Sequence, residues 1–175
     1  AIIIASSSRV KASRTMRIAG NLSAAGYAFP GTMLAIGVLC CLGMVVQLLS
    51  WTYIYLSGTL FALFFAYLVR FQAVGYGAIS SGLTKIPLNL FSCSRSLGLN
   101  APKTTIRVTI PLVKKSIIVG AVLAFVDIMK ELPMTLLLRP FNFETLATYS
   151  YQFAHDELMD QASLPALIII IVGLM

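Results

Sequence analysis

The chain has 175 residues, of which 58% are hydrophobic and only 11% charged. An ordinary soluble domain carries about a quarter charged residues, so this composition excludes that class and indicates a membrane protein. The net charge of +7 suggests nucleic-acid binding, but all six acids lie between Asp127 and Asp160, and every basic residue except Lys130 and Arg139 precedes them. Such sorting is typical of membrane topology, with the basic segments in the cytoplasm and the acidic segment outside.

The N-terminal part predicts a basic cytoplasmic loop followed by two crossings. The stretch Ile18–Val69 contains no charged residue and would measure roughly 78 Å as one helix at about 1.5 Å per residue. That is too long for one crossing of about 30 Å, so we expect spans at 22–46 and 53–70. Pro30 interrupts the first span, and Arg70 is expected to mark the cytoplasmic end of the second.

The C-terminal part continues this alternation. Residues 71–115 are basic and rich in proline, which predicts short cytoplasmic or interfacial helices. A third span is expected at 116–133, an external loop at 139–163 and a partial span at 164–175. The sequence therefore predicts an all-α, multi-pass helix bundle, and we interpret it as one transmembrane domain cut at both ends.

A polar cluster lies near the outer end of the third predicted span. Asp127, Lys130 and Glu131 are expensive in lipid, so they are expected to face protein or water. One interpretation is a lining or gate of a translocation path. The other is a neutralised interfacial cluster that fixes the depth of the helix, in which Asp127 and Lys130 pair at a spacing of three.

Chemical sites are sparse elsewhere. Cys40 and Cys41 fall in a predicted span and Cys93 in a predicted cytoplasmic loop, so no disulfide framework and no metal site is expected. The acids, tyrosines and single His of the external segment predict a solvated loop that docks a partner rather than an iron site. No phosphate loop, nucleophile elbow or zinc-protease pattern is present, so we expect neither an enzyme nor a cofactor.

One motif stands in the basic stretch. It reads Ser92-Cys93-Ser94-Arg95-Ser96-Leu97-Gly98, and Val108, Ile110 and Pro111 follow, the proline thirteen residues after the glycine. This spacing resembles the EAA loop of binding-protein-dependent ABC permeases, with the glycine, both aliphatic residues and the proline in the expected places. The resemblance implies a coupling loop that contacts a separate ATPase, with Leu97 as the anchor among the basic side chains of Arg95, Lys103 and Arg107.

The motif differs from the family pattern at its first three positions. The alternative interpretation of this stretch is an ordinary basic loop at the membrane surface. Ser92 stands where the family has Glu, and Cys93 and Ser94 replace the two alanines. A serine can cap a helix but cannot form an ion pair, so Ser92 cannot supply the coupling that the family's acid provides.

Further segments look like the C-terminal half of ferric-iron permeases of this superfamily. They are 26–32, 66–71, 130–140 and 145–148. The resemblance implies a bacterial inner-membrane protein whose partners are ABC ATPase subunits, a periplasmic iron-binding protein, the other permease half and membrane lipid, with no nucleic acid. The alternatives are a permease for thiamine, sulfate or a polyamine, and a membrane scaffold or intramembrane enzyme without an ATPase.

Overall fold

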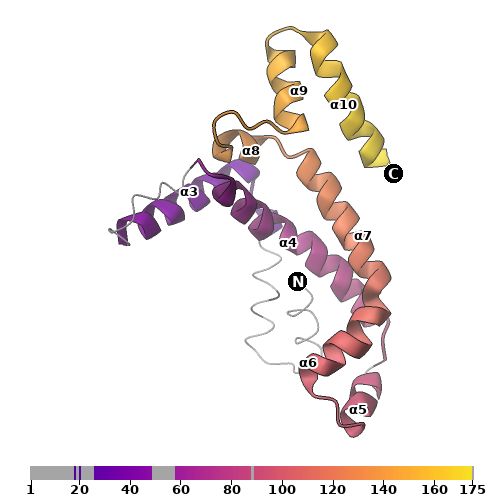
Figure 1. Cartoon of the computed structure of the whole chain (residues 1–175). Helices are drawn as coiled ribbons and strands as arrows, with labels where there is room; N and C mark the ends of the chain where they lie inside the picture. The colour runs from indigo at the N-terminus through magenta and orange to yellow at the C-terminus, as the bar shows by residue number, and fades with distance from the viewer. Residues whose placement is uncertain (1–17, 19, 21–25, 49–57, 88, 175) are drawn as a thin grey trace. The chain divides into compact units, whose positions relative to one another are not determined.

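The computed structural model describes residues 18, 20, 26–48, 58–87 and 89–174, and in these ranges the regular elements are helices, with no strand (Figure 1). The predicted all-α class is confirmed there. The longer helices are α3 (Gly31–Leu48), α4 (Leu60–Thr84), α7 (Ile110–Met129) and α10 (Met159–Leu174). The shorter ones are α5 (Asn89–Ser96), α6 (Ala101–Thr104), the π-helix η1 (Thr105–Thr109), α8 (Pro133–Leu138) and α9 (Leu146–His155).

Two of the described helices, α3 and α4, are long and apolar enough to cross a membrane. Both come from the predicted charge-free region or its continuation, which supports the membrane class. The other two longer helices are not counted among these candidates. Helix α7 carries the charged residues Lys114, Lys115 and Asp127, and α10 has only 16 residues. The connection between the first two predicted spans and the start of the second span lie largely outside the described residues.

The helix boundaries differ from the predicted spans. Helix α3 starts at Gly31, directly after the non-helical residues Phe29 and Pro30. Helix α4 does not end at Arg70 but continues to Thr84, so the first part of 71–115, where separate short helices were expected, belongs to this long helix. Helix α7 begins at Ile110 rather than at residue 116, because Pro111 suits a first helical turn and the two lysines lie on the helix itself.

The chain divides into two compact units, 1–28 with 71–124 and 29–70 with 125–175. The first unit has a core that joins α4, α5 and α7, formed by Ile79, Leu83, Ile86, Phe91 and Val113. Small residues bring α4 and α7 close together: a Cβ on Gly120 would lie 2.9 Å from the Cβ of Ala78 and 3.5 Å from the Cα of Gly75. Such close approach between helix backbones is a common way of packing helices in membranes.

The second unit is built around α8. Met134, Thr135 and Leu138 of this short helix are fully buried, and α8 packs against α3. Helix α3 buries one stripe of residues, Gly31, Ala35, Val38 and Leu42, in which the small residues Gly31 and Ala35 are four apart. Helices α9 and α10 lie side by side in the same unit (Figure 1).

Candidate functional site

Helix α5 carries the first half of the motif and ends at its glycine. Gly98 has φ +79°, a left-handed conformation that glycine adopts without steric cost. Its N–H donates to the carbonyl of Arg95 at 2.9 Å, and the N–H of Leu99 donates to the carbonyl of Ser94 at 3.1 Å. This pair of bonds is the Schellman motif, which satisfies the last carbonyls of a helix. The end of α5 is therefore fixed by hydrogen bonds.

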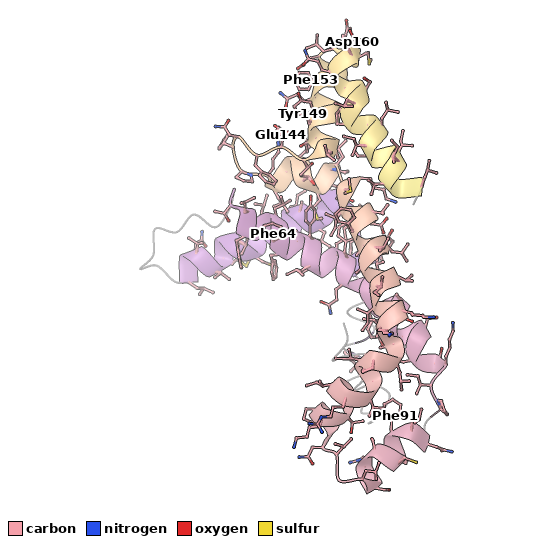
Figure 2. The ribbon with its side chains drawn as sticks, turned by 45° about the vertical axis from the view of Figure 1, so that its right-hand side comes forward. Phe64, Phe91, Glu144, Tyr149, Phe153 and Asp160 are labelled. Atoms are coloured by element: carbon pink, nitrogen blue, oxygen red, sulfur yellow. The ribbon has the colours of Figure 1, made fainter. Side chains whose placement is uncertain are left out.

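The two faces of α5 differ in burial. Phe91 points into the core of the first unit (Figure 2), and Ser94 one turn later is also buried. Leu97 follows at the glycine-terminated end with 81% of its surface exposed. Ser92, Cys93 and Arg95 are exposed as well. The helix thus holds one face in a core and presents a bare leucine beside a basic residue.

Ser94 ties α5 to the following helix. Its hydroxyl oxygen lies 2.8 Å from the carbonyl of Phe91, to which it donates, and 3.2 Å from the hydroxyl oxygen of Thr104 at the end of α6. Since the Ser94 proton goes to the carbonyl, Thr104 is the donor in the second bond. From the sequence, Ser94 was interpreted only as a replacement for an alanine of the family motif. No pattern of residue spacing indicates that Thr104 is its partner.

The second half of the motif forms the junction between α6 and α7. The N–H of Ile110 donates to the carbonyl of Thr105, five residues back, which is the π-helical pattern. Pro111 has no N–H to offer Arg107, so an unbroken α-helical ladder is impossible at this point. Val108 lies within η1, while Ile110 and Pro111 start α7. All the motif residues therefore belong to the first unit.

The predicted polar cluster is divided by the structure. Asp127 and Lys130 form the expected pair, with 2.8 Å between carboxylate and ammonium and Lys130 59% exposed. Glu131 is buried and instead pairs with Arg70 of α4 at 3.7 Å. The sequence predicts Arg70 at the end of a span, and it does not indicate that Arg70 pairs with Glu131.

The pair of half-buried Arg70 and buried Glu131 lies at the start of α3. Arg70 Nη1 donates to the carbonyl of Phe29 at 3.2 Å, at the non-helical break before Pro30. A Cβ on Gly31 would clash with a carboxylate oxygen of Glu131 and would lie 2.9 Å from Arg70 Nη1. Helix breaks in a membrane are tolerated where neighbours satisfy the freed backbone groups, and Arg70 does this here.

A hydroxyl pair one turn away strengthens the same junction. The Tyr67 and Thr135 oxygens are 2.5 Å apart, and the Thr135 hydroxyl donates to the carbonyl of Glu131 at 2.7 Å. Because threonine has one proton to donate, Tyr67 is the donor between the two side chains. Helix α4, helix α8 and the start of α3 are thus joined by one polar network.

The segment predicted to be external gathers aromatic rather than ligating side chains. The rings of Tyr149 and Phe153 on α9 are 4.4 Å apart (Figure 2), and those of Tyr151 and His155 are 6.1 Å apart. Among the residues that the structure describes, no three His, Cys, Asp or Glu side chains come together as a metal site.

The chain matches no protein-family model and no curated protein sequence. Any assignment of function therefore depends on the motif spacing and on the geometry of α5 and its surroundings.

Proposed function

We propose that the chain is a membrane permease subunit of a binding-protein-dependent ABC importer of the ferric-iron type, and that α5 receives the movement of a separate ATPase. The observation that carries the proposal is Leu97, 81% exposed at the glycine-terminated end of a helix whose residues Phe91 and Ser94 are buried. An exposed apolar side chain on a rigid support is suited to a hydrophobic groove on a partner.

The packing of α5 supports transmission of movement. Phe91 shares a core with residues of α4 and α7, and Ser94 is hydrogen-bonded to Thr104. Packed interiors have low compressibility and transmit strain, so a force on Leu97 reaches both longer helices through these contacts. A loosely attached surface loop would absorb the same force by bending.

The electrostatics of this region favour an acidic partner surface. Arg95, Lys103 and Arg107 are exposed within the motif region, and no described residue from 71 to 124 is acidic. Ser92 removes the acid of the family pattern, so in this proposal Leu97 supplies the anchor and the basic side chains supply the attraction.

Co-purification of the ATPase tests the coupling role. The Leu97→Asp variant of the full-length protein should bind the ATPase roughly thirtyfold more weakly than the wild type, because loss of a central apolar anchor costs about 2 kcal/mol. Leu90→Asp is the matched control, since Leu90 lies on the same helix, is 39% exposed and is outside the proposed contact. Equal retention by the two variants would refute the assignment of Leu97.

Iron as the solute is tested separately. Uptake of labelled ferric iron by cells that lack the full gene should recover when the gene is restored. Equal uptake with and without the gene would remove iron from the proposal while leaving the ATPase contact intact, and thiamine, sulfate or a polyamine would then be the next solutes to test.

A further inference from the structure

The loop between α8 and α9 presents a bare aromatic ring. Phe141 is fully exposed and has the largest exposed fraction of any apolar side chain in the described ranges. Leu137, one turn earlier on α8, is nearly half exposed, whereas its neighbour Leu138 is completely buried. The loop therefore extends apolar surface outward from a helix that is itself firmly packed.

The loop is held in this conformation by its own contacts. Phe143 N–H donates to the carbonyl of Pro140 at 3.3 Å, and Asn142 between them has φ +59°, a conformation that asparagine tolerates in turns. An ion pair between Arg139 and Glu144 closes the base of the loop. The exposure of Phe141 is thus a property of a closed turn.

Glu144 also connects the loop to α9, which starts beside it (Figure 2). Its second carboxylate oxygen accepts a hydrogen bond from the Thr148 hydroxyl at 2.7 Å. Thr148 and Thr145 form a reciprocal capping box at the start of that helix. The aromatic tip is therefore fixed at both ends, by α8 before it and by α9 after it.

The charge pattern distinguishes between possible occupants. From Leu132 to Ala154 the only charged residues are Arg139 and Glu144, which neutralise each other. A soluble partner steered to this face would meet no net charge, whereas exposed Phe and Leu side chains favour burial at the boundary between lipid head groups and acyl chains. The acids Asp156, Glu157 and Asp160 lie at the other end of α9, at the turn into α10.

We infer that Phe141 is a membrane anchor: the closed turn 139–144 inserts its ring into the lipid interface and fixes the depth of α8 beside the buried end of α3. Lipid covers the ring, and the acidic turn after α9 stays in water. The inference concerns the bilayer and holds for any transported solute.

Tryptophan fluorescence tests this anchor. The single tryptophan is first removed by Trp51→Phe, and Phe141→Trp is then introduced into the full-length protein in phosphatidylcholine vesicles. We expect phosphatidylcholine with brominated acyl chains to quench the emission by at least about half and iodide in the buffer to quench it weakly. Leu158→Trp, in the acidic turn, is the control and should show the reverse pattern.

Two outcomes would overturn the inference. Strong quenching of Phe141→Trp by iodide with no effect of the brominated lipid would place the ring in water. Protection from both quenchers would show that protein covers the ring instead of lipid. Neither outcome bears on ATPase binding through Leu97, so failure of the anchor and failure of the proposed function can be told apart.

Discussion

Arg70 illustrates what a single residue contributes in the second unit. It lies inside the apolar helix α4, pairs with Glu131 and donates to the backbone of Phe29. A positive-inside argument treats each basic residue as a loop marker, so it assigns Arg70 to a span end. The pairing of Asp127 with Lys130 was predictable because spacing along one helix determines it. The partner of Arg70 was not, because only tertiary packing brings 70 and 131 together.

The buried pair predicts a specific pattern of stability changes. Arg70→Met or Glu131→Leu alone should destabilise the protein by about 3 to 5 kcal/mol, because each leaves a buried charge without its counter-ion. The double variant should recover much of this loss. Equilibrium unfolding in detergent micelles with increasing SDS measures all three free energies.

Lys130→Met is the control for this cycle. Its ammonium is more exposed than buried, so its removal should cost no more than about 1 kcal/mol. A double variant whose loss equals the sum of the two single losses would show that Arg70 and Glu131 are energetically independent.

Among the elements, the helix contacts of the first unit depend on small side chains. Ser116 and Gly120 of α7 are four residues apart and face Gly82, Gly75 and Ala78 of α4. Gly31 and Ala35 of α3 have the same spacing and are buried, but this spacing is too common in sequences to reveal which pairs are contacts. The end of α5 at Gly98 was readable from sequence, whereas the Ser94 to Thr104 bond depends on how α5 and α6 meet.

A larger residue at Gly120 should separate α4 from α7. Its Cβ alone would already press on Ala78, so Gly120→Leu should cost about 1 to 3 kcal/mol or more through overpacking. Gly77→Leu on α4 is the matched control, because a Cβ at Gly77 meets nothing within 4 Å. The thermal unfolding midpoint in detergent should fall for the first variant only; equal midpoints would argue against a close α4 to α7 contact.

For the whole molecule, the length of α4 changes the predicted topology. Its 25 residues span roughly 37 Å, enough to cross about 30 Å of hydrocarbon with Arg70 inside the helix. The cytoplasmic stretch would then begin near Lys85 rather than at residue 71. Composition and charge sorting predicted the class and the order of the segments. They could not place this boundary, because an arginine that is paired inside a helix looks in sequence like an exposed one.

Cysteine labelling distinguishes the two boundaries. In a background with Cys40, Cys41 and Cys93 changed to Ser, Gly77→Cys should resist a membrane-impermeant maleimide added to either side, because exposed Gly77 then faces lipid. Lys103→Cys should react from the cytoplasmic side only. Reaction of Gly77→Cys from the cytoplasm would restore the boundary at Arg70, and reaction of Lys103→Cys from outside would remove the basis for an ATPase contact.

The π-helical turn η1 links the spacing of the motif to a rotation about the helix axis. Residues 101–129 form a continuous helical segment in which the turn before Pro111 holds one residue more than an α-helical turn. Each residue of an α-helix corresponds to about 100° about its axis. The number of residues between Gly98 and Pro111 therefore determines the direction, around the axis of α7, in which α6 and the preceding Leu97 lie. Loss of a single residue there would swing the leucine by about a quarter turn while leaving every helix intact.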